Sequence, residues 1–271
     1  MKKLILIILL ALQNALFCMP AQAAIDHSVW DALLKKHVIP LRDGQVTQVD
    51  YAGFKMDRSQ LKQYLSLLSS VTRMDFDRWG KSEQLAFLIN AYNAWTVELI
   101  LPAYPNVASI KDLGSFLKTP WEKRFIPLLG ETRSLDDIEQ GLIRGSNRYN
   151  DPRIHFAVNC ASIGCPALRA EAYVPERLDA QLEDSTKAFL SDRGRNRLGE
   201  GTLNVSSIFK WYREDFEKGW RKANHLEKFL ALYKNDLGLD SNMANRLMTG
   251  DIAIEFMDYD WQLNAKTERK P

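Results

Sequence analysis

The residues best suited to chemistry lie in one stretch, Arg153–Pro166, in which a histidine, an asparagine and two cysteines follow one another. The run Arg153–Asn159 is typical of a β-strand, and alternate side chains of a strand point to the same face. His155, Ala157 and Asn159 would then share a face, with the small Ala157 leaving room between two polar groups. We expect this face to form the floor of a site.

One interpretation of the stretch is nucleophilic catalysis, in which a histidine activates a cysteine thiolate and an amide or acid orients the pair. Cys160 would be the nucleophile and His155 the base. Five residues of extended strand span roughly 16 Å, which is far beyond a hydrogen bond. The interpretation therefore requires the chain to reverse just after Asn159, or Cys165 to fold back instead, and Gly164 permits such a reversal.

Three other interpretations use the same two cysteines. A disulfide between Cys160 and Cys165 would close a tight turn at the Cα separation of roughly 5.5 Å that disulfides prefer. A metal site with His155 would lack a fourth ligand and the close cysteine pairs of structural zinc. Dithiol redox exchange would need a thiol near a helix N-terminus, which Cys165–Pro166 suggests, although the spacing is not Cys-x-x-Cys.

Further candidate site residues lie elsewhere in the chain. Asn90 and Asn93 share one face of an otherwise apolar helix, so each amide either ties down neighbouring backbone or lines a cleft and orients a catalytic group. Glu139 follows a predicted helix start and could face the site as a supporting acid. Trp211 and Tyr212 are interpreted as core residues or as the wall of a substrate-binding cleft that also contains Asn159 and Cys165.

The elements that must position these residues indicate an α+β fold. The strongest is the segment 82–101, which lacks glycine and proline and is apolar nearly all round, as in a buried central helix. We expect it to pack on a mainly antiparallel sheet with surrounding helices, because the predicted strands are scattered without regular βαβ alternation. The predicted helices are 26–42, 59–69, 134–145, 175–190 and 207–216, and the predicted strands are 46–51, 124–129, 153–159, 203–205 and 252–256. Ser59 is the predicted N-cap of the second helix.

The first residues indicate export. Two lysines, a short apolar run and an Ala-x-Ala ending make residues 1–23 a predicted cleavable signal peptide, with residues 24–271 as one domain. A lipoprotein acylated at Cys18 is the alternative, although the bulky Phe17 precedes that cysteine. Cleavage removes Lys2 and Lys3 from 36 basic residues, leaving 34 against 34 acidic residues. Such neutrality argues against nucleic acid or an anionic membrane as the main partner.

Four separated blocks resemble a known family. AFLINAYN (86–93), SLDDIEQGLIR (134–144), HFAVNCASIGCP (155–166) and IFKWYREDF (208–216) are similar to the domain-of-unknown-function family numbered 547, with a family-like core at about residues 75–220. The resemblance implies a single exported bacterial domain and no defined substrate. A looser likeness links the chain to papain-like and transglutaminase-like folds, but Asn90 or Asn93 stands where those folds carry a cysteine.

These observations lead to two functional hypotheses. The first is a thiol-dependent hydrolase or acyl transferase acting on amides or esters of the cell envelope, with Cys160, His155, Asn90 or Asn93, and Glu139 as its catalytic groups. The second is a non-catalytic periplasmic or secreted binding domain, stiffened by a Cys160–Cys165 disulfide. Both predict a small-molecule or envelope substrate, no cofactor, no nucleic acid and no stable insertion in a membrane after cleavage.

Overall fold

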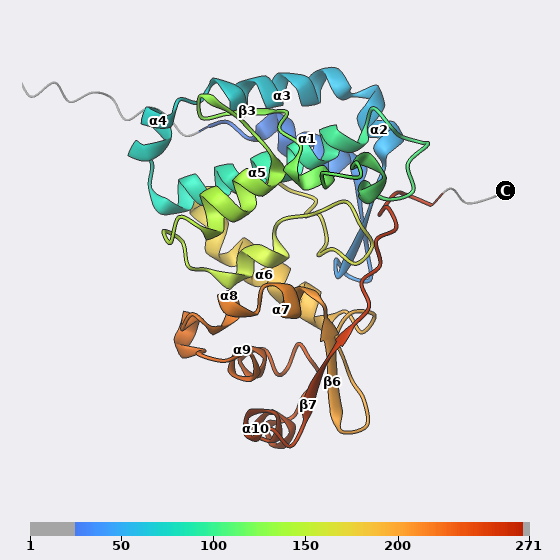
Figure 1. Cartoon of the computed structure of the whole chain (residues 1–271), viewed down its shortest axis with the longest axis vertical. Helices are drawn as coiled ribbons and strands as arrows, with labels where there is room; N and C mark the ends of the chain where they lie inside the picture. The colour runs from blue at the N-terminus through green and yellow to red at the C-terminus, as the bar shows by residue number, and fades with distance from the viewer. Residues whose placement is uncertain (1–24, 268–271) are drawn as a thin grey trace, which may run out of the picture.

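The computed structural model describes residues 25–267, in which helices and three small sheets alternate along the chain (Figure 1). The predicted signal peptide and Cys18 lie outside this range. The α-helices are α1 (Ser28–His37), α2 (Tyr51–Met56), α3 (Arg58–Ser70), α4 (Arg73–Arg78), α5 (Lys81–Ile100), α6 (Leu178–Ser191), α7 (Ile208–Trp211), α8 (Arg213–Glu217), α9 (Leu226–Leu232) and α10 (Ser241–Thr249). The predicted α+β class is confirmed.

The remaining elements are short. The 3₁₀-helices are η1 (Ile110–Leu113), η2 (Pro120–Glu122), η4 (Pro152–Phe156), η5 (Pro175–Arg177) and η6 (Trp220–Lys222). The element η3 (Asp137–Arg144) is a π-helix. The strands are β1 (Val38–Leu41), β2 (Val46–Val49), β3 (Ile126–Leu128), β4 (Glu131–Arg133), β5 (Arg197–Leu198), β6 (Thr202–Ser206) and β7 (Ala253–Met257). Within residues 25–267, no helix is long and apolar enough to cross a bilayer.

The sheets differ from the single central sheet that the sequence predicted. β1 pairs with β2, β3 with β4 and β5 with β6, all antiparallel, whereas β6 and β7 run parallel. The helix α5 packs chiefly against α3, η3 and η5 rather than on a sheet. An apolar surface all round a helix predicts burial but does not specify which kind of element covers it.

The helix α5 is the centre of the larger hydrophobic core. Every residue from Gln84 to Ile100 is buried, as the uninterrupted apolar segment predicted. Its neighbours α1, α2 and α3 contribute large buried rings, including Trp30, Phe54 and Tyr64. A second hydrophobic cluster lies around β6 and α7–α9, below the first in Figure 1. The segment η4 joins the two, because Ile154 packs in the first cluster and Phe156 in the second.

The predicted strand at 153–159 is wrong. Pro152 and Asp151 start the tight helix η4 instead, since the Asp151 carboxylate accepts the Arg153 N–H at 3.0 Å and proline suits the first helical position. The strand alternation of His155, Ala157 and Asn159 therefore does not apply. The segment that follows η4 is held by α5, because the Asn93 side chain donates to the Ala157 carbonyl and accepts the Asn159 N–H.

Three other boundaries are corrected. The predicted helix 26–42 ends at His37, where the chain enters β1. The predicted helix 207–216 divides at Tyr212 into α7 and α8. Ser59 is not the N-cap of α3, because the helix begins after Asp57.

The segment 258–265 returns from β7 to the first part of the molecule (Figure 1). On the way it runs along the loop 161–164, where the Gly164 N–H donates to the Asp260 carbonyl at 2.8 Å and Ser162 bridges to Leu263. A Cβ at Gly164 would lie 3.0 Å from backbone atoms of Asp260, so a side chain here would require that backbone to move by a few tenths of an ångström. The C-terminal segment thereby becomes a wall of the site described next.

Candidate functional site

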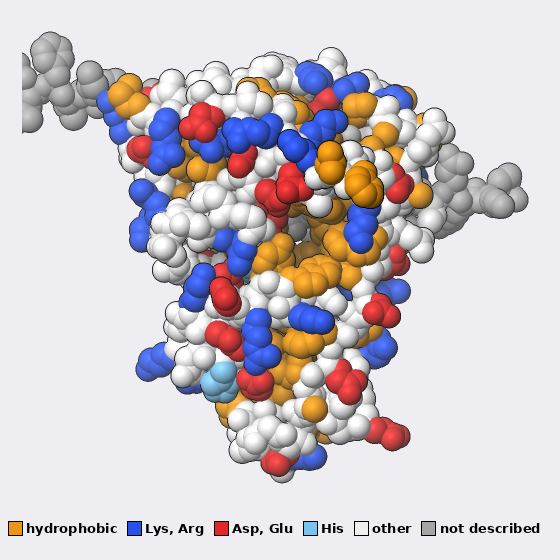
Figure 2. All heavy atoms as spheres, viewed as in Figure 1, with side chains coloured by type: hydrophobic (Ala, Val, Ile, Leu, Met, Phe, Trp, Pro, Cys, Tyr) orange, Lys and Arg blue, Asp and Glu red, His pale blue; other side chains and the backbone are white. Residues whose placement is uncertain are grey.

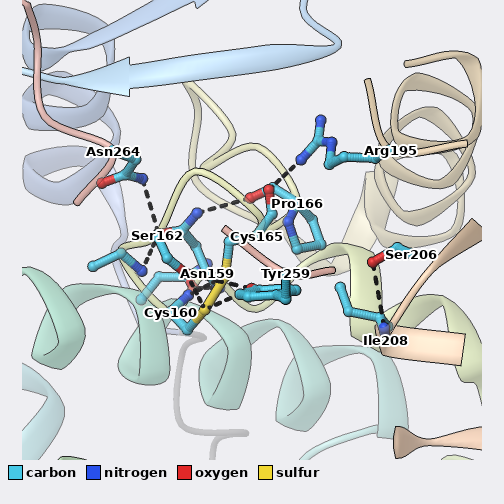
Figure 3. Close-up of a disulfide and its surroundings, with 12 residues drawn as sticks. Asn159, Cys160, Ser162, Cys165, Pro166, Arg195, Ser206, Ile208, Tyr259 and Asn264 are labelled. Atoms are coloured by element: carbon cyan, nitrogen blue, oxygen red, sulfur yellow. Dashed lines mark hydrogen bonds between the residues drawn. A yellow bond between two sulfur atoms is a disulfide. The ribbon is translucent and has the colours of Figure 1, made fainter. Parts of the chain in front are cut away.

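A disulfide joins Cys160 to Cys165, with their Cα atoms 6.1 Å apart (Figure 3). The loop between them turns through Ala161, whose φ of 62° is left-handed and rare for a residue with a side chain. The Asn159 carboxamide accepts the Ala161 N–H at 2.9 Å and stabilises that turn. The chain does reverse just after Asn159, as the sequence hypothesis required. Of the alternatives for the two cysteines, the structure has the disulfide.

The three asparagines stabilise backbone rather than line a cavity. Asn90 donates to the Tyr173 carbonyl at 2.8 Å and accepts the Tyr173 N–H at 3.0 Å. Asn93 donates to the Ala157 carbonyl at 2.9 Å and accepts the Asn159 N–H at 2.8 Å. The Asn159 amide donates to the Pro166 carbonyl at 2.7 Å. Both polar ends of each side chain are occupied, so these amides shape the site without facing a ligand.

A cavity of about 290 Å³ lies in front of the disulfide. Figure 2 shows hydrophobic side chains gathered around a hollow in the middle of this face of the molecule. The volume is at the lower end of the range of roughly 300–1,000 Å³ for small-molecule sites. The lining comes from α5, η2, η3, η4, α7, the disulfide loop and the C-terminal segment: Tyr92, Thr119, Trp121, Asp136, Glu139, His155, Val158, Cys160, Cys165, Pro166, Ile208, Trp211, Tyr212, Tyr259 and Trp261. Of the predicted site residues, the structure brings Glu139, His155, both cysteines, Trp211 and Tyr212 together here.

Two carboxyl groups enter the cavity from the start of η3. The Asp137 N–H donates to the Ser134 hydroxyl at 3.0 Å, and the Ser134 N–H donates to the Asp137 carboxylate at 2.9 Å. This reciprocal pair confirms the predicted helix start. Asp136 and Glu139 follow on the cavity side, and Glu139 is only 4% exposed. Within residues 25–267, neither carboxylate forms an ion pair. Asp136 was not among the site residues predicted from the sequence.

The two carboxylates alter the titration of their neighbours. Burial, assisted by the negative charge of Glu139, raises the pKa of Asp136 to about 6. Burial and the charge of Glu139 also raise the pKa values of Tyr92 and Tyr212 above the usual range for a phenol. Glu139 is therefore close to two phenol groups that remain protonated donors.

His155 is held at the edge of the cavity by a carboxylate. Its Nε2 lies 2.8 Å from Asp215 of α8, and its ring stacks on Tyr212 with centroids 4.0 Å apart. Burial lowers the pKa of His155, against the opposing effect of Asp215, so the imidazole is neutral near pH 7. Burial alone would raise the pKa of Asp215, but hydrogen bonds from His155, Arg144 and Lys218 lower it far below its usual value.

Asp215 was not among the site residues predicted from the sequence, although it lies in the block IFKWYREDF (208–216). A signal was present, because this acid follows the Trp211–Tyr212 pair within one helical turn and could share their face. Nothing in the sequence indicated that His155, 60 residues away, was its partner.

Aromatic rings form a large part of the cavity lining. Tyr259 lies 4.5 Å from Trp261 and 4.9 Å from Trp211 between ring centroids, and Trp121 meets the edge of Trp261 at 5.7 Å. Lys111 places its Nζ 3.9 Å from the centre of the Trp261 ring. The sequence indicated Trp211 but gave no reason to include Trp121, Tyr259 or Trp261, which come from η2 and from the C-terminal segment.

No metal centre is formed by His155, Cys160 and Cys165, because the two sulfurs are bonded to each other. Nor do the side chains of residues 25–267 contain any other group of three or more His, Cys, Asp or Glu that could hold an ion.

Comparison with known proteins finds one family model that matches part of the chain, and it supplies no activity. No curated protein and no solved structure matches it, so the looser papain-like and transglutaminase-like resemblance gains no support. Residues 76–190 match the model of the family described as "Protein of unknown function, DUF547". The match includes the first three sequence blocks and the whole disulfide loop, and it ends before the block at 208–216. The resemblance to DUF547 that the sequence blocks predicted is thus supported over residues 76–190.

Proposed function

We propose that this protein is an exported binding domain whose cavity takes a small organic cation, such as an alkylated ammonium group. The buried Glu139 carboxylate carries the proposal. The Tyr92 and Tyr212 hydroxyls bond Glu139 but are neutral, and a buried charge without a counter-ion is costly, so proteins normally pair such a group or give it a charged ligand. Glu139 is 4% exposed, lines the cavity and has no cationic partner among residues 25–267. A cation in the cavity would supply the missing charge.

The aromatic wall supports the same ligand class. Faces of Trp and Tyr attract cations by roughly 0.5–2 kcal/mol, most strongly where water is excluded. Trp121, Trp211, Trp261 and Tyr259 surround one side of the cavity, and the ammonium of Lys111 already lies over Trp261. A cavity lined by both acidic groups and aromatic rings suits an alkylated ammonium better than an anion or a purely apolar molecule.

The disulfide and the predicted signal peptide support export. Disulfides persist in oxidising compartments such as the bacterial periplasm. In this proposal the Cys160–Cys165 bond stiffens the rear of the cavity.

The competing hypothesis of a thiol-dependent hydrolase or acyl transferase needs a free Cys160 thiolate. In the disulfide form the sulfur is not available as a nucleophile. Titration of free thiols in protein isolated from the periplasm distinguishes the two. The absence of a free thiol supports the binding domain, whereas one reactive thiol of low pKa supports the enzyme.

The direct test compares choline with its uncharged isostere 3,3-dimethyl-1-butanol by calorimetric titration. We expect choline to bind at least tenfold more tightly, and Glu139→Gln to remove most of that preference. Glu200→Gln is the matched control, because this exposed acid lies outside the cavity lining. Equal affinity for the two compounds, or a choline preference that survives Glu139→Gln, would refute the proposal.

A further inference from the structure

The disulfide loop is held in place by more than its disulfide. Backbone hydrogen bonds join Ile163 to Gln262 at 2.8 Å and Asn264 to Ala161 at 3.0 Å, in addition to the bond between Gly164 and Asp260. On the other side, the buried Arg195 guanidinium donates to the Cys165 carbonyl (Figure 3). A disulfide whose only role was to fix this loop would add little, because the loop is already bonded to the C-terminal segment and to Arg195.

Both sulfurs face hydrogen-bond donors. The Cys160 sulfur lies 3.0 Å from the Ser162 hydroxyl and 3.1 Å from the Tyr259 hydroxyl (Figure 3). The Cys165 sulfur accepts the Cys160 N–H at 2.8 Å. A disulfide sulfur is a weak acceptor, whereas a thiolate is a strong one, so these donors stabilise the reduced pair more than the oxidised pair.

We propose that the Cys160–Cys165 disulfide exchanges with thiols that enter the cavity. Both cysteines line that cavity, and Cys160 is partly exposed whereas Cys165 is only 5% exposed. The accessible sulfur of Cys160 is therefore the one attacked. This inference does not depend on the charge of the ligand and goes beyond the proposed binding function.

The exchange balances in two steps. A thiolate of the incoming molecule attacks the Cys160 sulfur and forms a mixed disulfide, while the Cys160–Cys165 bond breaks and its electron pair leaves on Cys165 as a thiolate. The Cys160 N–H stabilises that leaving group. A second thiolate of the same molecule then attacks its own sulfur in the mixed disulfide and releases Cys160 as a thiolate, which Ser162 and Tyr259 stabilise.

Two electrons have then passed from the dithiol to the protein. Exchange with another small disulfide, by the reverse steps, restores the Cys160–Cys165 bond. Because the loop remains bonded on both sides, the two reduced cysteines stay adjacent and the bond can form again without refolding.

The test measures the equilibrium between the full-length oxidised and reduced protein in mixtures of 2-mercaptoethanol and 2-hydroxyethyl disulfide, with thiols trapped by alkylation. We expect Tyr259→Phe and Ser162→Ala each to shift this equilibrium toward the disulfide by roughly tenfold. Tyr259→Phe removes a hydrogen bond to the Cys160 thiolate, and Ser162→Ala removes the hydroxyl that contacts this sulfur and donates to the Tyr259 hydroxyl at 3.3 Å. Tyr149→Phe is the control, because the Tyr149 hydroxyl bonds the Gln84 side chain and neither residue lines the cavity in front of the disulfide. Equilibria unchanged by both variants would overturn the proposal.

A second measurement remains informative if one of these variants folds poorly. In Cys165→Ser, the free Cys160 thiol should react with 2,2′-dithiodipyridine along a pH profile whose midpoint lies below that of an ordinary thiol. Adding Tyr259→Phe should move the midpoint upward. A midpoint at the ordinary value, insensitive to Tyr259→Phe, would show that the disulfide is only structural.

Discussion

The Nε2 atom of His155 lies 2.8 Å from the carboxylate of Asp215, which joins η4 to α8 beneath the cavity. The same carboxylate accepts hydrogen bonds from Arg144 and from Lys218, the latter at 2.8 Å. His155 therefore donates its Nε2 proton to an anion and has a fixed orientation, and Asp215 connects three elements that line or support the site.

Replacement of Asp215 by asparagine should destabilise the protein by about 2 kcal/mol, because hydrogen bonds to a charged group are each worth roughly 1.5–3 kcal/mol and an amide retains only part of them. Urea unfolding measures the loss. Glu214→Gln on the same helix is the control, since this exposed acid should shift the unfolding free energy by less than about 0.5 kcal/mol. Equal effects of the two substitutions would contradict the role of Asp215.

Stability should fall as the pH falls below about 6.5. Burial lowers the pKa of His27 to about 4 and also lowers that of His155, so the unfolded chain binds protons that the folded chain does not. Each such histidine removes about 1.4 kcal/mol per pH unit between its unfolded and folded pKa values. Asp136 has the opposite effect. Between about pH 6 and pH 4 its carboxyl group is protonated in the folded chain but not in the unfolded chain, so its contribution to stability rises as the pH falls.

The variant His27→Asn isolates one of these contributions. It removes a titrating group while keeping a polar atom near the Tyr64 hydroxyl, which lies 2.7 Å from His27 Nδ1. We expect the unfolding free energy of the variant to fall less steeply than that of the wild type between pH 6.5 and pH 4. Parallel curves for the two proteins would rule out this origin of the acid sensitivity.

Binding of choline should weaken as the pH falls through about 6. The raised pKa of Asp136 means that this carboxyl group loses its charge there, and a quaternary ammonium does not titrate. Affinity should fall by up to tenfold per pH unit below the pKa, whereas Asp136→Asn should bind weakly and show less of this dependence. Titrations at pH 5 and pH 7.5 test the prediction, and a pH dependence retained in Asp136→Asn would assign it to another group.

A glycine in α2 should not tolerate a side chain. A Cβ at Gly53 would lie 2.4 Å from Nδ1 of His37, whose ring is buried and bonded to Asp57 at 2.7 Å. Gly53→Ala should therefore destabilise the protein by about 1–3 kcal/mol in thermal or urea unfolding. Gly141→Ala is the matched control in η3, where no atom would meet the added Cβ within 4 Å, and it should be neutral or stabilising by up to about 1 kcal/mol.

Features determined by neighbouring residues could be predicted from the sequence. The apolar segment around Asn90 indicated the buried helix α5, and Ser134 with Asp137 indicated the start of η3. The cysteine spacing allowed the disulfide but could not distinguish it from a free thiol. The strand prediction at 153–159 failed because local turn chemistry at Pro152 outweighed the apolar alternation.

Features determined by distant contacts could not be predicted. The hydroxyl of Tyr259 and the sulfur of Cys160 are 99 residues apart in the sequence, and no pattern in either segment indicates the other. The same holds for Asp215 and His155, which are 60 residues apart and are brought together where their neighbours Phe156 and Phe216 pack in the second hydrophobic cluster.

Because Tyr259 lies 99 residues after Cys160 and Trp261 follows it, the cavity can be complete only after residue 261 has been synthesised. A chain that lacks the segment 258–265 could still form α5 and the Cys160–Cys165 disulfide, but its cavity would lack the side chains of Tyr259 and Trp261. For the proposed binding function, a product clipped before residue 259 would therefore lose affinity for its ligand even where the rest of the chain remained folded.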